Sequence, residues 1–200
     1  MSRQKINLLN QAIQCLHCDK TNTLIMKKVT YNLKCLFFSV LILLSFNSTA
    51  QKIAENRVDE FTKDHIVRTS WERIISNQNF GAFFRISVIN ERFYFELKWM
   101  DRIAFSVDQG MELLIKMQNE DIISLRNTEY KMSCIGCGSI GLGGSSLPGV
   151  HLIYPIEKET ITKLKDYNVI KLRIYTSKGY IESEIKEKFA KRIKGSAALI

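Results

Sequence analysis

The sequence predicts an α+β fold that is mainly antiparallel β: one compact domain of about eight short strands, with two helices near the C-terminus. Three observations predict it. Apolar and polar residues alternate with a period of two through most of residues 66–184. Two long alternating runs, 80–89 and 92–100, meet at a short turn. Two late segments place apolar residues at intervals of three and four. Because about 150 residues can bury one hydrophobic core without stabilising disulfides or metal ions, residues 51–200 are predicted to form a single domain.

The residues before this domain have the layout of an export signal. Lys27 and Lys28 precede an apolar run of twelve residues, Cys35–Phe46, and small residues follow as far as Ala50. A helix needs about 20 apolar residues to cross a bilayer, and this run is shorter, so no permanent membrane anchor is expected. We expect cleavage between Ala50 and Gln51.

Met26 suggests where translation of the exported form begins. A start at this residue gives a signal peptide of ordinary length over 26–50, so residues 1–25 are expected to be an upstream start artefact. No cysteine follows the apolar run to carry a lipid. The mature chain is therefore expected to be periplasmic or secreted.

The charge of the mature chain is modest once the leader is set aside. The whole sequence has a net charge of +9, of which six basic residues and one acidic residue before Gln51 contribute +5. The remaining 23 basic and 19 acidic residues, a net of +4, are scattered. This pattern predicts a mixed, solvated surface and argues against nucleic acid as a partner.

The first part of the domain is predicted to contain a lead-in, a strand and a hairpin. Residues 51–64 are polar and predict a loose edge or one helical turn. Residues 66–74 alternate and predict a strand. The hairpin of 80–89 and 92–100 turns at Asn90, since asparagine tolerates the positive φ that tight turns require. Its aromatic side chains are expected to form much of the core.

The rest of the domain continues with short strands and ends with helices. Further strands are predicted over 103–107, 111–117, 122–125, 130–135 and 150–154, and a Gly- and Ser-rich loop over 136–149. Amphipathic helices are predicted over 157–167 and 185–194, the second ended by Gly195, with a hairpin of 169–176 and 180–184 between them.

Two Cys-x-x-Cys pairs raise the question of a metal site. The first, Cys15 and Cys18, lies upstream of the export signal, so a zinc site shared with Cys134 and Cys137 is not expected. Cys134 and Cys137 with His151 supply three weak candidate ligands and lack a fourth. Three interpretations stay open: a local disulfide or idle thiols, a redox pair, and a metal site.

Other chemical motifs are weak. The segment Gly136–Gly141 matches GxGxxG, but no helix follows to hold a phosphate, and no cofactor is expected. No serine stands in a strand–turn–helix context that would expose a nucleophile. Trp71 and Trp99 are expected in the core rather than in a ligand-binding strip. The sequence leaves enzyme activity undecided and favours a non-enzymatic role.

Three segments carry a resemblance: Asp59–Thr62, Arg68–Glu72 and Leu172–Glu182. Together with the leader, they resemble small exported proteins of unknown function from Bacteroidota. The resemblance implies export and no catalytic residue. We therefore expect a non-enzymatic binding or envelope-associated module, with another envelope protein or a polysaccharide as partner. The alternative is a thiol-redox or metal-binding protein centred on Cys134 and Cys137.

Overall fold

The computed structural model describes residues 51–76, 80–140 and 146–200. Every described residue belongs to one compact unit. The predicted signal peptide over 26–50, the segment 1–25 and the Ala50 side of the expected cleavage point lie outside the described residues. No helix among the described residues has the length and hydropathy that crossing a membrane requires.

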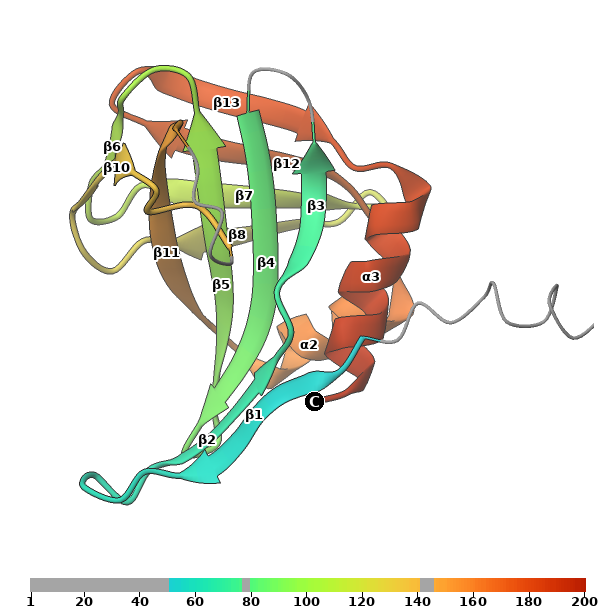
Figure 1. Cartoon of the computed structure of the whole chain (residues 1–200). Coiled ribbons are helices and arrows are strands. Elements are labelled where there is room, and N and C mark those ends of the chain that lie inside the picture. The colour runs from blue at the N-terminus through green and yellow to red at the C-terminus, as the bar shows by residue number, and fades with distance from the viewer. Residues whose placement is uncertain (1–50, 77–79, 141–145) are drawn as a thin grey trace, which may run out of the picture. The chain divides into compact units, whose positions relative to one another are not determined.

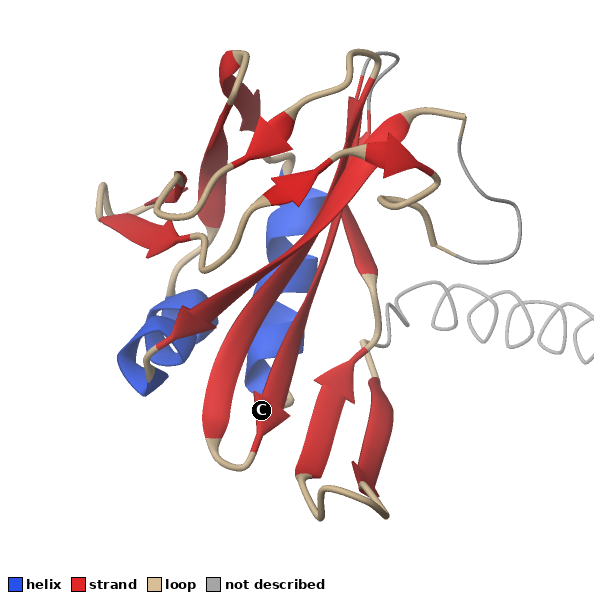
Figure 2. Ribbon diagram, turned by 90° about the vertical axis from the view of Figure 1, so that its left-hand side faces the viewer, coloured by secondary structure: helices blue, strands red, loops and turns tan. Residues whose placement is uncertain are grey.

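The larger sheet is antiparallel and has the order β1-β2-β4-β5-β11-β10, with β3 also pairing with β4 (Figure 1). Its strands are β1 (Ile53–Val58), β2 (His65–Thr69), β3 (Glu72–Ser76), β4 (Phe80–Ile89), β5 (Arg92–Asp101), β10 (Cys134–Ile135) and β11 (Pro148–Ile156). The β1–β2 and β4–β5 hairpins lie side by side and point the same way (Figures 1 and 2).

A smaller antiparallel sheet runs across the larger one (Figure 1) and has the order β13-β12-β7-β8. Its strands are β7 (Glu112–Met117), β8 (Ile122–Arg126), β12 (Val169–Thr176) and β13 (Gly179–Glu184), and the short strands β6 (Ser106–Val107) and β9 (Lys131–Met132) form a separate pair. Two helices, α2 (Lys158–Asp166) and α3 (Glu187–Ala198), complete the domain. The predicted class, mainly antiparallel β with two late helices, is confirmed.

The core lies between the inner faces of the two sheets and is closed by the helices. From the β4–β5 hairpin, Phe84, Phe95 and Trp99 are fully or almost fully buried, which confirms the predicted aromatic core. The smaller sheet contributes buried aliphatic side chains such as Leu113 and Ile174. Each such side chain contributes roughly 1.5–3 kcal/mol by leaving water.

The Asn90–Glu91 turn is the tight turn that the sequence predicts. Both residues have positive φ, 48° and 66°, as a two-residue hairpin turn of type I′ requires. The Asn90 side chain also joins the two hairpins, because its Oδ1 accepts the backbone N–H of His65 at 2.9 Å and its amide donates to Asp64. One residue thus fixes the register of β4 on β5 and holds the neighbouring hairpin beside it.

Several predicted boundaries are wrong. Residues 51–64 are not a loose lead-in, because β1 pairs with β2 along its length. The predicted strand 66–74 is divided into β2 and β3: Arg68 pairs with Ser87 and Glu72 with Phe84, so one residue is extra between them.

Two further boundaries differ for local reasons. The predicted strand 130–135 is divided into β9 and β10, since Ser133 leaves the ladder to exchange hydrogen bonds with Phe105 at 2.8 and 2.9 Å. Gly195 does not end the second helix, which continues to Ala198. Ser196 and Ala197, which follow Gly195, are fully buried, so packing against the rest of the domain carries the helix past the glycine.

Candidate functional site

The outer face of the larger sheet carries a group of interacting polar and aromatic side chains. Successive side chains of a strand point to opposite faces, so the residues between the core positions of β4, β5 and β11 gather here. We name this group the Trp71 cluster; its members are Arg68, Trp71, Arg85, Ser87, Glu96, Lys98 and His151.

Glu96 is the centre of the cluster, and its carboxylate is buried. One oxygen accepts two hydrogen bonds from the Arg85 guanidinium, at 2.9 and 2.7 Å, and lies 2.8 Å from His151 Nε2. The other accepts the Ser87 hydroxyl and lies 3.8 Å from Arg68 Nε. Burial by itself raises the pKa of the Glu96 carboxyl, but the hydrogen bonds from His151, Arg85 and Ser87 outweigh it and lower the pKa to about 2.

This arrangement is unsuited to proton transfer. In a serine-hydrolase triad the histidine lies between the serine and the carboxylate, so that it can take the hydroxyl proton. Here the Ser87 hydroxyl donates to Glu96 itself, and His151 contacts the same carboxylate on its other oxygen. A carboxylate with a pKa of about 2 is also a weak general base at neutral pH. The cluster therefore lacks the geometry of a serine-hydrolase triad.

Trp71 lies on this face and not in the core, so its predicted position is wrong. The extra residue between β2 and β3 turns its half-buried ring outwards, whereas Trp99 is fully buried as predicted. The Arg85 guanidinium carbon lies 4.5 Å from the ring centroid of Trp71 and the Lys98 Nζ lies 4.8 Å from it. The ring therefore attracts both cations and offsets part of their mutual repulsion.

Lys98 is a partly buried cation of the cluster. Burial lowers the pKa of its ammonium, and the positive charge of Arg85 lowers it further, against the opposing charge of Glu96. Within the described residues, its hydrogen-bond acceptor is the backbone carbonyl of Ser139 at 2.8 Å. An ammonium has three donors and a full charge, so a neutral carbonyl satisfies it only in part.

The segment that supplies the Ser139 carbonyl also contains Cys134 and Cys137, the cysteines that the sequence analysis singles out. Cys134 and Cys137 are joined by a disulfide, with their Cα atoms 5.4 Å apart, and both are exposed. β10 pairs Cys134 with Gly149 at the start of β11. The disulfide and this pairing together place Ser139 over Lys98.

His151 is the third of the weak candidate metal ligands, beside Cys134 and Cys137. The structure places it against Glu96 and edge-on to Trp71, with ring centroids 5.3 Å apart. Nowhere in the described ranges do three or more His, Cys, Asp or Glu side chains group as metal ligands would. His151 thus belongs to the Trp71 cluster, and no described arrangement joins it to the cysteines as a ligand set.

The sequence carried a signal for part of this cluster. Pairing the predicted hairpin about Asn90 and Glu91 places Arg85 directly opposite Glu96 on the polar face, as observed. A buried charge pair could have been predicted from that register. The contribution of Arg68 and His151 depends on strands that join the sheet from distant parts of the sequence.

Fold and site together define a small α+β domain of two antiparallel sheets with a charged, aromatic outer face. Comparison with known proteins does not extend this description: no family model, no curated protein and no solved structure matches the chain.

The lowered pKa of Glu96 predicts that the folded protein loses stability in acid. Its pKa is lowered from 4.5 to about 2 in the folded state, which corresponds to roughly 3 kcal/mol of stability. Because the folded-state pKa is the lower one, this stability is present above pH 4.5 and is lost as the pH falls towards 2. Urea unfolding at a series of pH values measures it. Glu96→Gln should be less stable at neutral pH by about 3 kcal/mol and lose less on acidification.

The control for this experiment is Glu60→Gln, which removes an exposed carboxylate from the β1–β2 turn. It should leave the pH profile of stability unchanged. A Glu96→Gln profile with the same acid dependence as the unsubstituted protein would contradict the assignment.

Two glycines hold the disulfide loop against the sheet, and their contact predicts a steric effect. A Cβ on Gly149 would lie 2.7 Å from the Gly138 nitrogen and 2.8 Å from the Trp99 carbonyl oxygen, both rigid backbone atoms. Gly149→Ala should lower the free energy of unfolding by about 1–3 kcal/mol. Gly81→Ala is the control, since the nearest atom to its Cβ would be the flexible end of Met100 at 3.2 Å and the Ile75 carbonyl oxygen at 3.8 Å is an ordinary contact. Equal effects of the two substitutions, measured by urea unfolding, would contradict this explanation.

Proposed function

We propose that this protein is an exported, non-enzymatic binding module and that the Trp71 cluster binds an acidic polysaccharide. The observation that carries the proposal is the environment of Lys98. Its ammonium lies 4.8 Å from the Trp71 ring centroid and donates to a backbone carbonyl instead of a carboxylate. A partly buried cation beside an aromatic ring suits a ligand that brings its own carboxylate.

The charge balance of the cluster supports an anionic ligand. Arg68, Arg85 and Lys98 contribute three positive charges, and two carboxylates oppose them. These are Glu96 and Glu55, which is 2.7 Å from Arg68. One positive charge remains, and it is the one on Lys98. A ligand carboxylate beside Lys98 would offset the repulsion from Arg85 that lowers the lysine pKa.

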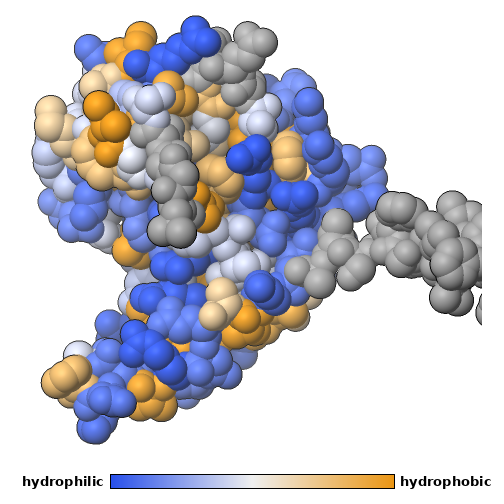
Figure 3. Space-filling model, viewed as in Figure 1, coloured by the Kyte–Doolittle hydropathy of each residue, from blue (hydrophilic) through white to orange (hydrophobic). Residues whose placement is uncertain are grey.

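The shape of the face favours a polymer over a small ion. Along β5, the outward side chains run from Tyr94 past Lys98 to Met100. Met100 lines a hollow of about 240 Å³ at one end, and Tyr94 lines another of about 590 Å³ at the other. Figure 3, viewed as Figure 1, shows mostly hydrophilic residues over the projecting β1–β2 hairpin at the lower left and a mixture of hydrophilic and hydrophobic residues above it. A chain of several sugars could follow this strip, with aromatic rings against its apolar faces and cations at its carboxylates.

A galacturonate oligomer is the probe for this site, and its methyl ester is the matched neutral ligand. Calorimetry should detect binding of the acidic oligomer, weakening as salt is added, and little binding of the ester. Lys98→Met should weaken binding about tenfold, because a charge-assisted hydrogen bond is lost while the aliphatic stem is kept. Lys178→Met, in the exposed β12–β13 turn, is the control.

Equal affinity for the oligomer and its ester would overturn the proposed ligand. So would unchanged binding by Lys98→Met.

Export itself gives a separate prediction. If the signal is cleaved after Ala50, N-terminal sequencing and intact mass of the exported protein should identify Gln51 as its first residue. Of the five cysteines of the full sequence, the mature protein would then keep Cys134 and Cys137. Thiol titration should count none before reduction and two after it. Detection of residues preceding Met26 in the exported protein would contradict the predicted leader.

The alternative function, a thiol-redox or metal-binding protein, is tested by the same two cysteines. One feature favours this alternative. Both cysteines are exposed, and Cys134 lies on the edge strand β10, where a thiol partner could reach the pair. Replacing both cysteines with serine should leave the oligosaccharide affinity within about threefold if binding, and not thiol chemistry, is the function. Zinc binding by the reduced protein that the double variant lacks would favour the alternative.

A further inference from the structure

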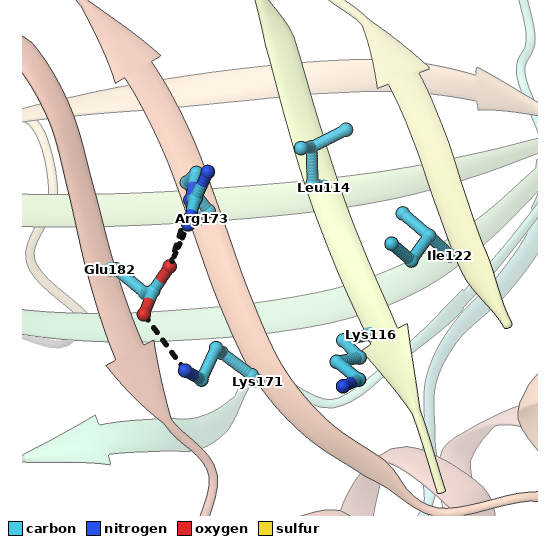
Figure 4. Close-up of a pocket in the computed structure, with 6 residues that line it drawn as sticks. All are labelled: Leu114, Lys116, Ile122, Lys171, Arg173 and Glu182. Atoms are coloured by element: carbon cyan, nitrogen blue, oxygen red, sulfur yellow. Dashed lines mark hydrogen bonds and ion pairs between the residues drawn. The ribbon is translucent and has the colours of Figure 1, made fainter. Parts of the chain in front are cut away.

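The hollow on the outer face of the smaller sheet has its charges already paired. Lys171 and Arg173 both donate to Glu182, at 2.9 and 2.8 Å, as the dashed lines in Figure 4 show. Lys116 lies 2.6 Å from Glu120. Cations that are paired with carboxylates have less to gain from an incoming anion. The groups that gain more from a partner lie at the edge of the larger sheet, on β1.

β1 is the first strand of the larger sheet and belongs to a hairpin that projects from the body of the domain (Figures 1 and 2). Among the described residues, the strand that pairs with β1 is β2. None of the six side chains of β1 is buried, and Val58 and the turn residue Phe61 are 57% and 94% exposed. An edge strand exposed in this way is a template for one more strand.

The hydrogen bonds of the hairpin define which backbone groups of β1 face outwards. The Asp59 N–H donates to the Asp64 carbonyl at 2.8 Å, so the backbone groups of Asp59 point towards β2. Hydrogen-bonded positions alternate along an antiparallel pair, so Arg57 and Glu55 also point their backbone groups towards β2. The N–H and C=O of Asn56, which lies between them, therefore point to the free edge.

The charges of β1 select one register for antiparallel pairing with a second copy of this chain. Two-fold symmetry that keeps the alternation can centre on Glu55, Asn56 or Arg57. A centre on Glu55 opposes two glutamates, and a centre on Arg57 opposes two arginines, and both arrangements are destabilising. A centre on Asn56 places Glu55 of each copy opposite Arg57 of the other. The strand is thus complementary to itself in this register.

We infer that β1 pairs with β1 of a second copy, antiparallel and centred on Asn56. The two Asn56 residues exchange backbone hydrogen bonds, and the two larger sheets become one. Each hairpin tip, with the exposed Phe61, is carried towards the start of the other β1. A bulge between Ile53 and Glu55 limits the regular ladder to a few residues, so we expect a dissociation constant of roughly 0.1 mM.

A proline at position 56 tests the backbone pairing. Asn56→Pro removes the N–H that faces the free edge and keeps the bonds to β2, since an edge strand tolerates proline where the missing N–H faces solvent. Asn56→Ala is the matched control, because it removes the same side chain, which lies 2.9 Å from His65 Nε2, and keeps the N–H. Sedimentation should show a monomer–dimer equilibrium that Asn56→Pro weakens at least about tenfold and Asn56→Ala changes less than about threefold.

Cysteine cross-linking tests the register. Directly opposite residues of a hydrogen-bonded pair have Cα atoms about 5.5 Å apart, within the range that a disulfide spans, whereas diagonal neighbours are about 7–8 Å apart. Asn56→Cys should therefore form a covalent dimer under mild oxidation. Glu55→Cys and Arg57→Cys should do so at least about fivefold more slowly, as measured on non-reducing gels and by mass.

A protein that stays monomeric up to about 1 mM would overturn the proposal, and so would a dimer that Asn56→Pro and Asn56→Ala weaken equally. Faster cross-linking of Glu55→Cys or Arg57→Cys than of Asn56→Cys would also overturn it. Circular dichroism identifies the folded variants, and the cross-linking result does not depend on the proline variant. Both position 56 variants keep Lys98, so dimerisation and polysaccharide binding can fail separately.

Discussion

The outer face of the domain depends on the hydrogen bonds and ion pairs of the buried Glu96 carboxylate. It joins four strands: Glu96 lies on β5, receives Arg85 and Ser87 from β4 and His151 from β11, and attracts Arg68 from β2. Removing a carboxylate from water is costly, and a buried charge is tolerated only when its partners are complete. The requirement fixes the register of all four strands at one level, since a slip of one residue would turn these side chains towards the core.

The same pleat explains why the face has both a buried network and an open cation. Each strand that places a charge outwards places an aromatic or aliphatic side chain inwards, so the rigidity of the core is transmitted to the cluster. Trp71 enters through a different device, the extra residue between β2 and β3. Such bulges re-aim side chains, and this one places an indole where it contacts Arg85, Lys98 and His151 together.

The sequence predicts local features of this domain better than its assembly. Asn90 marked the hairpin turn, and alternation about it placed Phe95 and Trp99 in the core, because both signals are contained in one short segment. Trp71 was misplaced because alternation continues through residues 66–74 and gives no sign of an inserted residue. Gly195 predicts a helix end, yet α3 continues past it to Ala198 because Ser196 and Ala197 are buried against the domain, a contact that the local sequence does not reveal. The network around Glu96 needs strands from three regions, which periodicity cannot align.

The two outer faces of the domain hold their positive charges in different ways. On the smaller sheet, Lys116 and Lys171 are half-buried and each is paired with a carboxylate, Lys116 with Glu120 at 2.6 Å and Lys171 with Glu182 at 2.9 Å. On the larger sheet, Lys98 is partly buried beside Trp71 and donates to a backbone carbonyl. A cation with a neutral acceptor has more to gain from an incoming anion than one already paired with a carboxylate, and the proposed polysaccharide site rests on that difference. The core beneath the larger sheet holds the strands that carry these outward side chains, so the position of Lys98 is set before any ligand arrives.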